Sequence, residues 1–278
     1  MSTLLFPTPT TPQTKISEQP SRPQAKTAEK LDVILDFAQP ATTARTRTAP
    51  PHILFSPMHY EAGYKYPLLV WLHPAGENEH QLIRIMPQIS VRNYVAVAPR
   101  GFPSAAASAP PPILDLSVAG ILHRPKEVYD WQNTHRRTEI EQRIFDCIAV
   151  AQMRCSISPD KVFIAGFGSG GTTALQLAAQ NPNRFAGAAS FGKNSMPHSS
   201  SDCRILPNWR TTRNLSIFLG ADAAAARETY RMMELFHTAG MATEAREYPD
   251  TTQLTEEMLR DLNRWMMEII CNTAGKRI

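Results

Sequence analysis

Hydrophobic residues in the first half of the chain form short continuous runs, and a segment of helical period separates two of them. The runs 51–57 (PHILFSP), 67–73 (PLLVWLH) and 94–101 (YVAVAPRG) are apolar with little alternation. Strands that are covered on both faces of a sheet have this pattern. Residues 79–93 (EHQLIRIMPQISVRN) repeat their apolar positions with the period of a helix.

The second half continues this alternation of strands and helices. The further segments are helical patterns at 134–158, 169–182, 227–240 and 255–270, and strand-like runs at 159–168, 185–192, 214–222 and 242–249. Such an order is typical of an α/β fold with a mostly parallel sheet and helices on both faces.

Two segments depart from this pattern. Residues 102–133 contain five prolines and little periodicity, and a loop of this length is typical of a lid, a binding loop or an insertion. Residues 1–30 are rich in Pro, Thr, Ser, Gln and Lys and carry little apolar surface. We therefore expect a disordered tail over 1–30 and a single domain over 31–278.

Composition and charge exclude several classes of function. The formal net charge is +4, but the 29 basic residues are scattered among 25 acidic ones, so no nucleic-acid partner is expected. The four cysteines have no metal-binding spacing, so we expect no metal and no cofactor. No apolar run approaches the ~18 residues of a membrane span, and the N-terminus lacks the features of a secretory signal. A cytoplasmic location is expected.

One segment has the form of a catalytic turn. In VFIAGFGSGGTTAL (162–175) a strand runs through a glycine-rich turn into a helix, which is the context of the nucleophile elbow G-x-S-x-G. Together with 67–79 (PLLVWLHPAGENE) and 247–266 (EYPDTTQLTEEMLRDLNRWM), the chain resembles the carboxylesterase, phospholipase and acyl-thioesterase branch of the α/β-hydrolases. Polyhydroxybutyrate depolymerases and feruloyl esterases are similar too. The resemblance runs from about residue 50 to the end and implies an α/β-hydrolase fold.

The resemblance also implies where a catalytic triad belongs. The nucleophile falls on Gly168, which has no side chain, and the general base falls on Gln253, which cannot accept a proton near neutral pH. The acid falls on Asp222, directly after a predicted strand. Two of the three catalytic positions are therefore vacant.

The oxyanion hole implied by the resemblance is better preserved. Its two donors are the backbone N–H groups of Ser169 and Ala75. His73 and Gly76 belong to the same loop motif, in which His73 is expected to be structural. We predict a pocket for a carbonyl oxygen or an anion at this helix N-terminus. Trp131, at the end of the long loop, either lines the pocket or anchors the loop.

Ser169 offers an alternative nucleophile. A shift of one residue points its side chain in another direction, however, so we interpret Ser169 as a helix cap. Among the histidines, His198 could reach the site, while His123, His135 and His237 offer no base.

Three functions follow from these patterns. The first is a degenerate hydrolase that binds a small acyl or anionic ligand or a protein partner. The second is an active carboxylic-ester or thioester hydrolase that uses Ser169 in a rearranged site. The third is a structural partner without any ligand.

Overall fold

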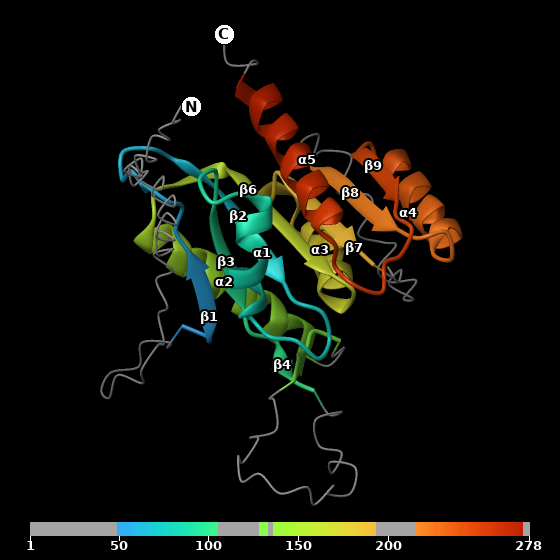
Figure 1. Cartoon of the computed structure of the whole chain (residues 1–278), viewed down its shortest axis with the longest axis horizontal. Helices are drawn as coiled ribbons and strands as arrows, with labels where there is room; N and C mark the ends of the chain where they lie inside the picture. The colour runs from blue at the N-terminus through green and yellow to red at the C-terminus, as the bar shows by residue number, and fades with distance from the viewer. Residues whose placement is uncertain (1–48, 105–127, 133–135, 193–214, 275–278) are drawn as a thin grey trace, which may run out of the picture. The chain divides into compact units, whose positions relative to one another are not determined.

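A seven-stranded sheet forms the centre of the domain (Figure 1). The computed structural model describes residues 49–104, 128–132, 136–192 and 215–274. The sheet order is β1-β3-β2-β6-β7-β8-β9, and every pairing is parallel except that of β1 with β3. Its strands are β1 (His52–Phe55), β2 (Tyr66–Leu72), β3 (Val95–Pro99), β6 (Ile157–Phe167), β7 (Gly187–Phe191), β8 (Ser216–Ala221) and β9 (Ala242–Glu247). The predicted α/β fold with a mostly parallel sheet is confirmed.

Helices cover both faces of the sheet, which explains why β2 and β3 are apolar throughout. The helices are α1 (Gln81–Ile89), α2 (Arg137–Arg154), α3 (Ser169–Gln180), α4 (Ala226–Thr238) and α5 (Glu256–Ala274). Helices α1 and α5 contact each other on one face (Figure 1). There Trp265 of α5 packs against Phe163 and Phe218, with ring centroids 6.0 and 5.8 Å apart. Apolar side chains of α2, α3 and α4 join a core cluster on the other face.

The segment 102–133, predicted as one long loop, is partly strand. Two short strands, β4 (Phe102–Pro103) and β5 (Tyr129–Asp130), pair antiparallel and bring its ends together. Sequence periodicity did not detect them because each strand has only two residues. Residues 105–127 and 133 lie outside the described residues, as does the predicted tail over 1–30.

The carboxyl ends of the parallel strands are tied together by backbone hydrogen bonds. Gly168, after β6, donates its N–H to Phe191 O (2.8 Å), and Gly192, after β7, donates to Gly220 O (3.1 Å). Tyr248, after β9, donates to Ala221 O (2.8 Å). In open α/β sheets ligands bind outside this edge, so the loops that follow these strands are the place to look for a site.

Candidate active site

Gly168 forms the turn between β6 and α3. Its backbone has φ 56° and ψ −120°, a conformation that residues with a side chain rarely adopt. The space beside it is open, because a Cβ added there would meet only Pro74 Cβ, at 3.7 Å. The turn therefore has the sharp geometry of an elbow and room for a side chain, but it carries none.

The glycines on either side of the turn are required by close packing. A Cβ on Gly166 would lie 2.5 Å from the backbone carbon of Gly170. A Cβ on Gly170 would lie 2.2 Å from Leu72 O and 2.5 Å from His73 O. The first turn of α3 thus packs directly on the end of β2, and Pro74, which follows that strand, lies beside the elbow.

The interpretation of Ser169 as a helix cap is wrong. Gly168 is the N-cap residue, and no side chain makes a capping hydrogen bond at this end of α3. Ser169 is 8% exposed, and its Oγ is buried with no hydrogen-bond partner among the described residues. At the first position of the helix its side chain turns toward the packed interior. The hydroxyl is therefore shielded from solvent.

The loop after β2 contributes one exposed backbone donor to this edge. Ala75 is exposed, and neither its N–H nor that of Ser169 donates to an acceptor in the described ranges. The N–H of Gly76 is already used, because it donates to Tyr129 O (3.0 Å). Ala75, unlike Gly76, thus keeps an exposed backbone donor for a ligand.

His73 is a structural residue in the same loop. It is fully buried, its Nε2 accepts the N–H of Gly101 (3.0 Å), and its Nδ1 donates to Pro74 O (2.8 Å). Trp131 donates its indole N–H to His73 O (3.0 Å) and is 2% exposed. These contacts favour the anchoring role for Trp131, and they fix the course of the chain from His73 to Ala75.

We expect the protein to lose stability as the pH falls below 6.5. Burial lowers the pKa of His73 below its ordinary value of 6.5, against the hydrogen bond with Pro74 that raises it. The unfolded chain binds a proton below that pH while the folded chain does not, so the free energy of unfolding decreases until the folded-state pKa is reached.

Chemical denaturation at several pH values between 5 and 7 measures this effect. A His73→Gln variant should show a smaller pH slope than the wild type. A His237→Gln variant, which changes an exposed histidine in the last turn of α4, is measured in parallel for comparison. Equal slopes for all three proteins contradict the assignment to His73.

An ion pair between a half-buried arginine and a buried carboxylate holds the other end of the loop. Glu79 is 2% exposed, and Arg100 donates from Nε to its two carboxylate oxygens (2.8 and 2.9 Å). Burial alone would raise the pKa of Glu79, but the hydrogen bonds and charge of Arg100 outweigh it and hold this pKa below its ordinary value. Sequence patterns missed the pair, because charges 21 residues apart carry no periodic signal.

Asp222 lies directly after β8, where the resemblance puts the acid. Its Oδ1 accepts the N–H of Ala225 (2.9 Å), and its Oδ2 accepts the hydroxyl of Thr251 (2.6 Å). The bond from Thr251, followed by that from Ala225, lowers the pKa of the carboxyl below its ordinary value. Gln253 is exposed and makes no hydrogen bond with Asp222 among the described residues. The structure thus brings Thr251 to Asp222, and not Gln253.

Histidines supply no partner for Asp222 within the described ranges. His237 lies in the last turn of α4. His123, His135 and His198 lie outside the described residues.

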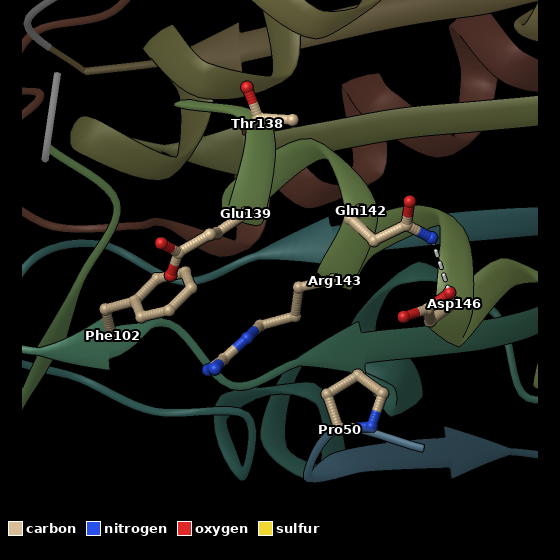
Figure 2. A pocket seen from close by; sticks show the side chains of 7 residues that line it. All are labelled: Pro50, Phe102, Thr138, Glu139, Gln142, Arg143 and Asp146. Atoms are coloured by element: carbon tan, nitrogen blue, oxygen red, sulfur yellow. Dashed lines mark hydrogen bonds between the residues drawn. The ribbon is translucent and has the colours of Figure 1, made fainter. Parts of the chain in front are cut away.

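A cavity of about 340 Å³ lies elsewhere, along α2 (Figure 2). Figure 2 shows that Arg143 points between Phe102 and Pro50. Its guanidinium lies 3.8 Å from the centroid of the Phe102 ring and donates to Arg100 O (3.1 Å) and Gly101 O (2.8 Å). The cavity contains none of the predicted site residues, and Arg143 serves to hold the turn after β3.

The described part of the chain has neither clustered metal ligands nor a membrane-spanning helix. No group of three or more His, Cys, Asp or Glu side chains in that part is arranged to hold a metal ion. None of its helices is both long and apolar enough to span a bilayer.

Comparisons with known proteins agree with this fold. The family model described as "Putative esterase" matches residues 44–260. A carboxylesterase from Mesorhizobium loti superposes with a TM-score of 0.58 at 16% identity, over 79% of this chain and 95% of that chain. A carboxylesterase from Bacillus cereus gives a TM-score of 0.55 at 13% identity, over 78% and 93%. A variant of SOBER1 from Arabidopsis thaliana gives a TM-score of 0.55 at 15% identity, over 74% of this chain and 99% of that chain.

No curated protein matches the sequence. The α/β-hydrolase fold is confirmed.

Proposed function

Since this chain belongs to the esterase family, whose model spans residues 44–260, we propose that it is a catalytically degenerate member that binds a ligand without hydrolysing it. The observation that carries the proposal is Gly168. It occupies the turn between β6 and α3, in the backbone conformation of an elbow, yet offers no hydroxyl. An ester carbonyl above this turn meets no nucleophile.

The burial of Ser169 argues against a rearranged active site. Its Oγ is shielded from solvent and has no base beside it in the described ranges. A serine without a base is a weak nucleophile at neutral pH. Loss of one triad member alone costs about 10⁴-fold or more in rate, and here both the nucleophile and the base are vacant.

The ligand we propose carries a carbonyl or carboxylate group. The backbone N–H groups of Ala75 and Ser169 are without acceptors in the described residues, and Ser169 begins the twelve-residue helix α3. The positive end of a helix dipole favours an oxygen with negative charge. A small acyl group or anion would satisfy both donors, and a protein partner would do so through a carboxylate.

Ester hydrolysis tests the catalytic half of the proposal. With p-nitrophenyl acetate, the wild type should release p-nitrophenolate no faster than buffer, and a Ser169→Ala variant should behave in the same way. Robust turnover that Ser169→Ala abolishes would establish the rearranged hydrolase instead.

Titration with butyrate tests the binding half. In ¹⁵N NMR spectra the amides of Ala75 and Ser169 should shift together in a saturable manner, because both donate to the added carboxylate. The amide of Gly63, exposed in the loop before β2, serves as the control and should stay fixed. Unchanged resonances of Ala75 and Ser169 at millimolar butyrate contradict this half.

The same proposal includes a domain over residues 31–278, a separate tail over 1–30 and a cytoplasmic location. The continuous sheet from His52 to Glu247, closed by α5, supports a single domain. The described cysteines, Cys147, Cys155 and Cys271, are free thiols, which supports a reducing compartment.

A further inference from the structure

The loop between β9 and α5 turns one particular side chain toward the end of β8. Asp250 accepts hydrogen bonds from the N–H and the hydroxyl of Thr252, both at 2.8 Å. This local turn, which Asp favours, leaves Asp250 and Thr252 exposed, while Thr251 is 5% exposed. Since the N–H of Tyr248 binds Ala221 O, the loop starts next to Asp222.

In a catalytic triad the general base can be located by its hydrogen bond to the acid. The acid holds the base through a hydrogen bond and thereby orients it toward the nucleophile. The side chain at the place of the base is therefore the one that contacts the acid. In this chain the contact is made by Thr251, whose hydroxyl donates to Asp222 Oδ2 at 2.6 Å. Gln253, four residues after Pro249, is exposed.

We propose that Thr251, and not Gln253, occupies the place of the general base, and that its hydroxyl is the side-chain partner that holds Asp222 in this protein. This inference rests on the proposed function, in which Asp222 keeps the place of the acid. Both carboxylate oxygens are then engaged, one by Thr251 and one by Ala225. Thr251 is a positioning residue that fixes the loop over the strand ends.

The position of β8 in the sheet fits this assignment. β6 and β8 flank β7, so the ends of β6 and β8 lie two strand spacings apart, about 10 Å. If position 251 carried a histidine bound to Asp222 and position 168 carried a serine, their side chains together would span this distance. The ring nitrogen facing the elbow could then take the hydroxyl proton as the oxygen bonds to an ester carbonyl carbon. The same proton would pass to the departing alcohol, and water would release the acyl group.

Two double variants distinguish the two positions. Gly168→Ser with Thr251→His should hydrolyse p-nitrophenyl acetate with a kcat/KM about 100-fold above Gly168→Ser alone, the usual scale of general-base catalysis. Gly168→Ser with Gln253→His should stay near Gly168→Ser, because an imidazole at that exposed position lacks the acid. Adding Asp222→Asn to the first double variant should remove its gain.

Equal or greater turnover from the variant with Gln253→His overturns the assignment. So does the lack of any gain from the variant with Thr251→His when circular dichroism shows that it folds. Turnover by the wild type that depends on Ser169 would instead contradict the proposed function. The result that overturns the assignment of Thr251 therefore differs from the result that overturns the proposed function.

A second measurement covers the case in which Thr251→His does not fold. Thr251→Val nearly preserves the shape of the side chain and removes the donor, so ¹³C NMR should show the pKa of Asp222 rising toward its ordinary value. Gln253→Leu is the matched control and should leave this pKa unchanged. An Asp222 carboxyl that titrates in Thr251→Val as in the wild type overturns the proposal.

Discussion

Replacing Gly170 with alanine is expected to lower the free energy of unfolding by about 3 kcal/mol or more, the upper part of the range for overpacked cores. The added Cβ would lie 2.2 Å from Leu72 O and 2.5 Å from His73 O. Both neighbours are backbone atoms at the end of a central strand, so no side chain can rotate away. The first turn of α3 would have to move off β2, and the elbow would move with it.

Thermal unfolding measures this effect. For a domain of this size, about 3 kcal/mol corresponds to a fall of about 10 °C in Tm. Gly63→Ala is the matched control, because nothing lies within 4 Å of a Cβ at that exposed position. Its Tm should stay within about 2 °C of the wild type. Similar Tm values for the two variants contradict the packing described for α3.

Arg100→Met is expected to cost about 3 to 5 kcal/mol, because it leaves the carboxylate of Glu79 buried without its partner. Glu79 is 2% exposed and receives its hydrogen bonds chiefly from Arg100. The damage should be greatest near neutral pH and smaller in acid. There the unpaired carboxyl, whose pKa would rise with burial, takes up a proton.

Denaturant unfolding of a second arginine variant provides the control. Arg84 pairs with Glu77 at 2.8 Å, but its side chain is 60% exposed. Arg84→Met should therefore cost less than about 1 kcal/mol. If both variants lose the same stability, the pair of Arg100 with Glu79 does not anchor the loop as described.

The sequence predicted the fold well because buried strands differ from amphipathic helices in their apolar period. The run YVAVAPRG became β3, and the helical pattern over 227–240 became α4, which ends at Thr238. The apolar period of a strand does not show whether that strand pairs parallel or antiparallel with its neighbour. The antiparallel β1 at the sheet edge therefore had to come from the structure, as did the two-residue strands β4 and β5.

The site was predictable where backbone geometry decides it. Glycines around position 168 indicate a tight turn, and the structure contains it. The directions in which loop side chains point could not be predicted from the sequence. Counting residues from Pro249 selects Gln253, but the hydrogen bonds of Asp250 with Thr252 turn Thr251 inward. Likewise the composition of the elbow gives no sign that the hydroxyl of Ser169 is buried without a partner.

Intact-mass measurement after treatment with an excess of a fluorophosphonate shows whether this elbow carries a reactive hydroxyl. Such a reagent forms an oxygen–phosphorus bond with an activated serine and releases fluoride, so an active serine esterase treated in parallel should gain one adduct. The mass of the wild-type protein should stay unchanged, because the elbow has no reactive hydroxyl. An adduct that peptide mapping places on Ser169 would contradict it.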